Sequence, residues 1–370
     1  MAWPGFLAGA LISLLTSFML VTRLERVGER LGLSEGLLGL VAALAADAPE
    51  ITSAVTAVAH HQQRVGAGVI VGSNVFNLAA LLGLGALVAG RIGLHRKVVA
   101  LGGAVALWVA GVSLAVVLGA IPAVAGLVLA VAVAALYVLV LGRRGRGLGV
   151  LRLPPGWIAW LRSAVSQEEQ ELESAIRPRR GTAQDVVIAA AALIVVIAAS
   201  VTMERAASVL GIRYAVPEIV TGGLVLAAVT SLPNAVAAVY LAARGRGAAT
   251  LSTALNSNNL NVIAGLLLPA AVIGLGRPTG QAVLITTWYA ILTLATLAFA
   301  YRDHGLSRGS GTLIIAAYLA FTASVLASGY AIPHSSAVVA ALGAATTAAL
   351  AAGLAFGRRT GGPAPDRTQA

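Results

Sequence analysis

Two acidic side chains lie three residues apart inside an otherwise apolar stretch of the chain. Asp47 and Glu50 are flanked by residues 37–46 and 51–59, which hold no other charged side chain. On a helix, a spacing of three places both carboxylates on the same face. Carboxylates inside an apolar segment are costly and usually functional, and no Lys or Arg occurs in the apolar segments to pair with them. The pair therefore predicts a site that holds a cation or protons.

Neutral oxygen ligands are predicted to complete this site. Pro49 has no N–H to donate to the carbonyl of Ala45, and Pro233 likewise leaves the carbonyl of Val229 free. Carboxylate, amide, hydroxyl and carbonyl oxygens suit Ca²⁺, Mg²⁺ or Na⁺, and Ca²⁺ takes about 6–8 of them. No His or Cys occurs in the stretches that hold these oxygens, residues 45–50, 72–77, 228–234 and 256–261, which disfavours transition metals. The candidate side-chain ligands besides the two acids are Ser73, Asn74, Thr230, Ser231, Asn234 and Asn258.

The elements that must position these residues are membrane-spanning helices. Of the 370 residues, 58% are hydrophobic and 11% are charged, and the mean hydropathy is +0.90. A water-soluble protein of this size needs far more charged surface. The net charge of +11 comes from short arginine clusters between apolar segments, which encode topology and do not indicate a nucleic-acid partner. The composition predicts an all-α integral membrane protein whose surroundings are the lipid bilayer.

Eleven segments are long and apolar enough to cross a bilayer of about 30 Å. With the N-terminus outside, 21 of the 25 Lys and Arg residues fall on the inner side. This asymmetry predicts a multi-pass protein of the cell membrane with a cytoplasmic C-terminus. The predicted spans are residues 3–22, 36–59, 66–90, 98–119, 121–142, 183–203, 217–243, 248–275, 280–300, 310–329 and 334–356.

The second half of the chain repeats the first at an offset of 184 residues. Because five predicted spans separate the equivalent points, the two copies are expected to have opposite orientations. The predicted fold is an inverted-repeat 5+5 helix bundle with one extra C-terminal helix. The matching residues are Gly39-Leu40-Val41 with Gly223-Leu224-Val225, Pro49 with Pro233, Ser73-Asn74 with Ser257-Asn258, and Asn77 with Asn261.

The repeat also divides the chain into regions. The first repeat covers residues 1–142, with its core at 39–77, and the second covers residues 183–329, with its core at 223–261. A cytoplasmic or interfacial linker at 143–182 joins them. Residues 330–370 hold the extra helix and a cytoplasmic tail.

The two repeat cores carry a family resemblance. Residues 45–50 with 72–77, and 228–234 with 256–261, resemble the paired Gly-Thr-Ser-x-Pro-Glu and Gly-Ser-Asn helices of the cation/calcium antiporter superfamily, the sodium/calcium exchangers and their relatives. The resemblance implies a secondary antiporter that exchanges Ca²⁺ for Na⁺ or H⁺ by alternating access at a midplane site. Inorganic cations are then the transported substrates, and no cofactor is expected.

The chain also departs from the family pattern. Ala46 and Asp47 stand where the family usually has Thr and Ser, and Asn234 stands where it has the second Glu. One carboxylate has in effect moved from the second repeat to the first, and the formal charge of the site stays at −2. The expected site is therefore lopsided, which leaves the choice of counter-ion open.

Several alternatives remain at this stage. Two close carboxylates in a low-dielectric site do not both ionise readily, so protons are as plausible a counter-ion as Na⁺. Mg²⁺ transport, Na⁺/H⁺ exchange and a transport-inactive sensor or scaffold are also compatible with the sequence. Ser, Thr and Asn side chains also join packed membrane helices without binding any ion, and this applies to Ser73, Ser257, Asn77 and Asn261. An enzyme is not predicted, because two acids on one helix leave little room for a substrate between them.

Overall fold

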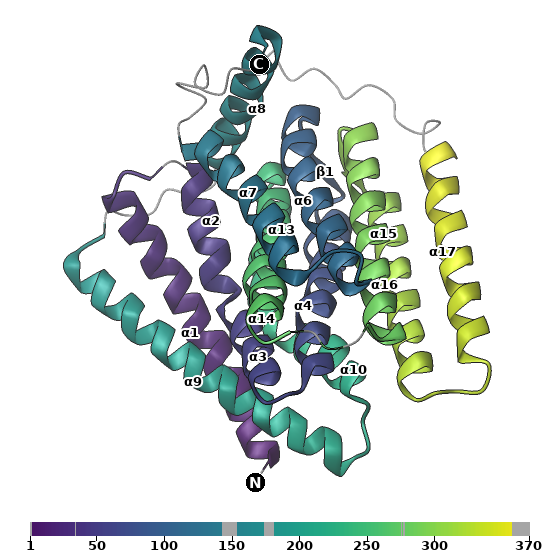
Figure 1. Cartoon of the computed structure of the whole chain (residues 1–370). Helices are drawn as coiled ribbons and strands as arrows, with labels where there is room; N and C mark the ends of the chain where they lie inside the picture. The colour runs from purple at the N-terminus through teal and green to yellow at the C-terminus, as the bar shows by residue number, and fades with distance from the viewer. Residues whose placement is uncertain are drawn as a thin grey trace.

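The computed structural model describes residues 2–33, 35–142, 154–173, 181–274, 276 and 278–356, and nearly all of them are helical (Figure 1). Seven long helices are uninterrupted. Two of them outrun the predicted spans, because α1 continues from residue 22 to Arg30 and α9 continues from residue 203 to Arg213. The seven are α1 (Ala2–Arg30), α6 (Arg96–Val117), α7 (Ala123–Gly142), α9 (Ala183–Arg213), α15 (Gly280–Arg302), α16 (Arg308–Gly329) and α17 (Ser335–Phe356).

The two segments that contain the prolines are broken helices. The axis bends by 51° between α2 and α3 and by 49° between α11 and α12. Proline lies in the first turn after each break, where its missing N–H costs least. The elements are α2 (Glu35–Ala46) and α3 (Ala48–Ala59) in the first half, and α10 (Glu218–Val220), η3 (Thr221–Leu226), α11 (Ala227–Thr230) and α12 (Leu232–Ala243) in the second.

Two further segments pass through a wide helical turn of the π type. One π segment begins directly after Asn77, and the other begins at Asn261. Such π segments occur frequently at functional sites. The elements are α4 (Gln63–Asn77), η1 (Leu78–Leu84) and α5 (Gly85–Ala89), and α13 (Gly247–Leu260), η4 (Asn261–Leu267) and α14 (Leu268–Val272).

All eleven predicted spans fall on helical segments. Eight helices in the described residues are long and apolar enough to cross a membrane, and the two bent pairs bring the number to ten. The span predicted at 248–275 is helical but does not meet this apolar standard, because it carries the polar run Asn256-Ser257-Asn258-Asn259. Length and apolarity therefore account for ten of the eleven predicted crossings.

The helices pack around α4, whose membrane segment is almost entirely buried. Helices α1 and α9 run alongside each other at one edge of the bundle, and α17 lies at the opposite edge against α16 and α15 (Figure 1). The α1–α9 pair is joined by a hydroxyl contact of 3.0 Å between Ser13 and Ser200 and by a 2.7 Å ion pair between Arg23 and Asp185. This arrangement places the broken helices between the α1–α9 pair and the α4 core.

One end of the bundle carries two smaller features. Strand β1 (Arg91–Gly93) pairs antiparallel with β2 (Gly305–Ser307), and Arg91 and Arg96 donate to carbonyls at the end of α15. Helix α8 (Pro155–Glu173), within the predicted linker, buries Val165 against the bundle and packs on α2, α6 and α13. Lys97 at the start of α6 donates a 2.6 Å hydrogen bond to the hydroxyl of an α8 serine.

Candidate cation site

The two helix breaks hold equivalent residues in nearly the same backbone conformation. Asp47, between α2 and α3, has φ −82° and ψ −5°, and Ser231, between α11 and α12, has φ −85° and ψ −3°. The two positions are 184 residues apart, which is the offset of the sequence repeat. Each break turns the first residues of the following helix toward the centre of the bundle. Asp47 and Glu50 are both fully buried there.

Both acids accept hydrogen bonds from the second half of the chain. The Asn234 amide donates to Asp47 Oδ1 at 2.8 Å, and the Ser257 hydroxyl donates to the same oxygen at 2.5 Å. The Ser231 hydroxyl donates to Glu50 Oε1 at 2.8 Å. None of the ion pairs among the described residues involves either acid. Their charge is therefore met by neutral donors alone.

Three pairs of hydrogen bonds across the site are reciprocal under the 184-residue offset. Asn74 donates to the backbone carbonyl of Asn258 at 3.1 Å, and Asn258 donates to that of Asn74 at 3.1 Å. Asn77 donates to Asn258 Oδ1 at 3.1 Å, and Asn261 donates to Asn74 Oδ1 at 3.2 Å. The bonds from Asn234 to Asp47 and from Ser231 to Glu50 follow the same rule, because each of these partners is the counterpart of the other acid. The bond from Ser257 to Asp47 does not, because its counterpart Ser73 donates to the Ala227 carbonyl. In the three reciprocal pairs, when one residue contacts a second, their repeat counterparts also contact each other, as in a self-complementary two-fold contact.

Five buried oxygens around this network have no hydrogen-bond partner in the protein. Buried acceptors are normally paired, so a cluster of unpaired ones indicates a place for a cation or a proton. They come from α3 and its preceding break, α4, α12 and η4, and so surround the centre of the bundle. The atoms are Asp47 Oδ2, Glu50 Oε2, Asn77 Oδ1, Asn234 Oδ1 and Asn261 Oδ1.

Two predicted ligands direct their hydroxyl hydrogens elsewhere. The Thr230 hydroxyl donates to the carbonyl of Leu226 in its own helical segment at 2.9 Å. The Ser73 hydroxyl donates to the carbonyl of Ala227 at 3.3 Å, and so joins α4 to α11. Both side chains are buried next to the site, and neither donates to an acid. Their hydrogen bonds are those of helix packing.

The two carbonyls that the prolines were expected to free are not free. The Ala45 carbonyl accepts a 3.5 Å hydrogen bond from the Ser17 hydroxyl of α1. The Val229 carbonyl accepts a backbone N–H at the end of α11. The two carbonyls are therefore not unpaired, as they were expected to be, and their role as cation ligands stays a prediction. Each carbonyl oxygen keeps one further lone pair.

Three residues take part in the site more directly than the sequence indicated. Ser257 contacts Asp47, and the amide oxygens of Asn77 and Asn261 are unpaired. By contrast, the Oδ1 atoms of Asn74 and Asn258 already accept amide hydrogens. The signal was present in the sequence, since all three residues fall within the repeat. Their types alone could not separate ligands from residues that only join helices.

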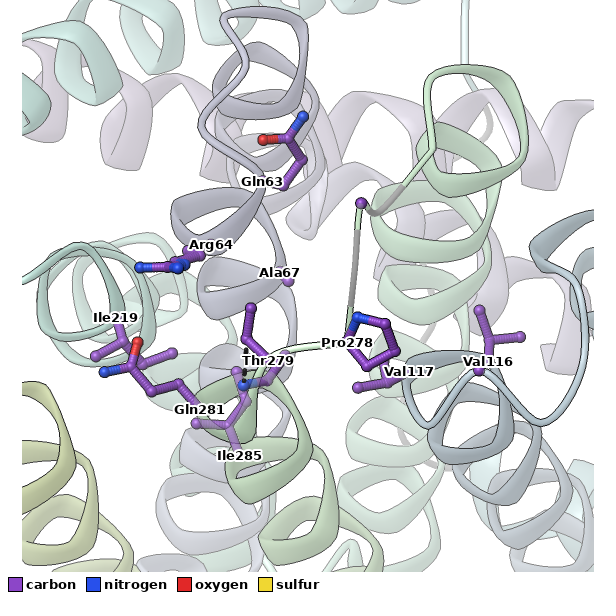
Figure 2. A pocket seen from close by; sticks show the side chains of 13 residues that line it. Gln63, Arg64, Ala67, Val116, Val117, Ile219, Pro278, Thr279, Gln281 and Ile285 are labelled. Atoms are coloured by element: carbon purple, nitrogen blue, oxygen red, sulfur yellow. Dashed lines mark hydrogen bonds between the residues drawn. The ribbon is translucent and has the colours of Figure 1, made fainter. Parts of the chain in front are cut away.

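A pocket of about 110 Å³ opens at the end of the bundle where α4 and α15 begin, and neither acid lines it (Figure 2). In it, the Thr279 hydroxyl caps α15 by accepting from the Ala282 backbone N–H. The acids are thus closed off from this pocket by protein. Its lining includes Gln63, Arg64, Ala67, Val116, Val117, Ile219, Pro278, Thr279, Gln281 and Ile285.

Apolar helices that enclose carboxylate and amide oxygens are typical of membrane proteins that transport ions. The family profile described as sodium/calcium exchanger protein matches residues 1–144 and 185–327. The chain belongs to this family. Among curated proteins, none matches the chain significantly.

Solved structures share the fold at low sequence identity. The H⁺/Ca²⁺ exchanger CAX superimposes with a TM-score of 0.66 at 16% identity, over 97% of this chain and 90% of CAX. The sodium-calcium exchanger NCX_Mj gives 0.54 at 21% identity, over 88% of this chain and 98% of its own. The native YfkE structure gives 0.56 at 16% identity, over 88% and 99%. The likeness extends over most of the helical bundle.

Proposed function

We propose that this protein exchanges Ca²⁺ for protons at the site formed by Asp47 and Glu50. The observation that carries the proposal is the group of five buried, unpaired oxygens around two carboxylates that have no basic partner. Two carboxylates and three amide oxygens supply five hard ligands, close to the lower end of what Ca²⁺ takes. The formal charge of −2 matches one divalent cation.

Protons are the counter-ion that this ligand set favours. Only the two carboxylates can take up protons, and both are buried where an unneutralised charge is costly. Separate Na⁺ sites have fewer hydroxyl ligands available, because Ala46 and Asp47 stand where the family usually has Thr and Ser. Ca²⁺ and protons would then compete for the same oxygens. CAX, which shares the fold, is an H⁺/Ca²⁺ exchanger, in agreement with this proposal.

The stoichiometry follows from the charge of the site. Moving one Ca²⁺ outward against about 100 mV, inside negative, costs roughly 4.6 kcal/mol from charge alone. Two protons moving the other way carry the same charge, so the potential drops out and the proton gradient drives the exchange. We infer an electroneutral exchange of one Ca²⁺ for two protons.

Alternating access would use the internal symmetry of the bundle. The reciprocal hydrogen bonds between equivalent residues support two repeats that meet at the site. The distribution of Lys and Arg supports an N-terminus outside and a C-terminus in the cytoplasm. A two-fold relation makes the two routes to the site equivalent in principle. The proposed cycle opens the site to one face and then to the other, with Ca²⁺ and protons bound in turn.

Flux measurements in vesicles test this function. Purified protein is reconstituted into sealed liposomes that contain a Ca²⁺ indicator. Ca²⁺ movement is then followed after a jump in pH or in Na⁺ concentration. A pH gradient should drive Ca²⁺ movement without a change in membrane potential, and Glu50→Gln should abolish it. Movement driven by Na⁺ and indifferent to pH would replace protons by Na⁺ as the counter-ion.

A transport-inactive sensor is the second candidate, and it is favoured by Asn234 at the position where the family has its second glutamate. The same preparation separates the two. A sensor would be stabilised by Ca²⁺ in a thermal unfolding assay and would show no flux under either gradient.

A further inference from the structure

Helix α15 presents a line of hydroxyl groups to the core of the bundle. Thr286, Tyr289, Thr293 and Thr296 are spaced by three and four residues, and each is at most 1% exposed. This helix packs against α4, which carries Asn74. The Tyr289 and Thr296 hydroxyls have no hydrogen-bond partner. A fully buried phenol without a partner is costly, so its position calls for an explanation.

The Tyr289 hydroxyl lies beside an incompletely used amide. It faces the side chains of Asn74 and Thr293, but it makes no hydrogen bond of good geometry in this arrangement. The Asn74 amide nitrogen has two hydrogens, and one of them goes to the carbonyl of Asn258. Among the hydrogen bonds of the described residues, the second hydrogen has no acceptor. An unpaired donor and an unpaired acceptor are thus neighbours.

The other half of the bundle has no equivalent of this phenol. Helix α6 packs against α13, which carries Asn258, as α15 packs against α4, which carries Asn74. The buried face of α6 carries one hydroxyl, that of Ser113, and it donates to the carbonyl of Ala110 in its own helix. The symmetric amide network therefore lies in asymmetric surroundings, and Tyr289 is what distinguishes the α4 side.

We propose that Tyr289 is a positioning residue for the cation site, which holds the Asn74 amide when the cation is bound. Its oxygen accepts the second hydrogen of Asn74, and its own hydrogen goes to Thr293 Oγ1. The Thr293 hydroxyl already donates to the Tyr289 carbonyl at 2.8 Å, so the bonds form a continuous chain. A cation bound at the unpaired Oδ1 of Asn261 polarises that amide, which donates to Asn74 Oδ1 at 3.2 Å, and so strengthens the N–H of Asn74 as a donor. The contact then tightens when the cation binds and loosens when it leaves.

This inference rests on the proposed cation site, and Tyr289→Phe tests it because it removes one oxygen and leaves the ring. The full-length protein in detergent is titrated with CaCl₂, and the thermal midpoint is followed. We expect the half-saturating Ca²⁺ concentration to rise about tenfold, as for the loss of a hydrogen bond in the outer shell of a metal site. Without Ca²⁺ the melting temperature should stay the same or rise, because the lost hydroxyl has no partner in that state.

The matched control is Tyr318→Phe on α16, which removes a hydroxyl from a half-buried ring packed on Phe76 and Phe321. It should leave the half-saturating concentration unchanged. If Tyr289→Phe leaves Ca²⁺ affinity unchanged, or lowers stability equally with and without Ca²⁺, Tyr289 is a packing residue and the inference is wrong. If wild type is not stabilised by Ca²⁺ at all, it is the proposed function that fails. Should Tyr289→Phe not fold, Thr293→Val removes the acceptor at the end of this chain of hydrogen bonds. It should likewise raise the half-saturating Ca²⁺ concentration.

Discussion

At the scale of single residues, the site is defined by how the charges are distributed. Asp47 and Glu50 both come from the first half, and their direct partners Asn234 and Ser231 come from the second. Each partner is the repeat counterpart of the other acid. Moving a carboxylate between Asp47 and Asn234 therefore exchanges two groups that already contact each other at 2.8 Å. The site can change which half supplies its charge without changing its total.

This relation predicts a compensating pair of substitutions. Asp47→Asn alone should raise the half-saturating Ca²⁺ concentration on the order of 100-fold, equivalent to about 2.8 kcal/mol, because it removes one of two charges. Adding Asn234→Asp should recover most of that loss, because it restores a carboxylate at the residue that is hydrogen-bonded to position 47. Ca²⁺-dependent thermal stabilisation measures both variants. If the double variant binds no better than Asp47→Asn, the total charge of the site is not what sets its affinity.

At the scale of elements, the site depends on how closely two segments approach. Helix α4 crosses η3 through glycines, and a Cβ at Gly72 would overlap the carbonyl oxygen of Gly223. A Cβ at Gly68 would also come close to the backbone at Gly223. This contact keeps α4, with Asn74 and Asn77, against the broken helix of the second half. Larger residues here would separate the two halves of the site.

Gly72→Ala is accordingly expected to destabilise the protein by about 2–3 kcal/mol, because backbone atoms cannot yield to the methyl group. The matched control is Gly111→Ala on α6, where an added Cβ meets nothing within 4 Å. Alanine there should stabilise the helix by about 0.5–1 kcal/mol. Thermal unfolding in detergent compares the two. Equal melting temperatures for both variants would contradict the close contact.

At the scale of the whole molecule, exchange requires that the bound ions stabilise the folded bundle in competition with each other. The two acids and the five unpaired oxygens belong to segments from both halves of the chain. A cation that they bind joins those segments. Ligand binding should therefore appear as a change in global stability.

We expect Ca²⁺ at 100 times its dissociation constant to add about 2.7 kcal/mol of stability. Because protons compete for the same carboxylates, the gain at a fixed Ca²⁺ concentration should shrink as the pH falls. Melting temperatures measured across a pH series, with and without Ca²⁺, check the sign. A gain that is constant with pH and removed by Na⁺ would favour Na⁺ as the competing ion.

The sequence by itself determined the helical segments, the repeat and the identity of the acids. Apolar runs of bilayer length marked ten of the eleven predicted spans in the described residues, since this signal is local in the chain. Pro49 and Pro233 marked both helix breaks for the same reason. The single offset of 184 residues correctly paired Asp47 with Ser231, two positions with the same backbone conformation.

The tertiary structure alone decided which oxygens are paired and which are available. The carbonyl of Ala45 is met by Ser17, a residue of another helix, and the amide oxygens of Asn77 and Asn261 are left without donors. Tyr289 comes next to Asn74 only because α15 packs on α4. Such partners lie far apart in the chain and depend on helix rotation and depth. No local spacing encodes them, so the sequence indicated the candidate site, and only the packing shows which of its oxygens are unpaired.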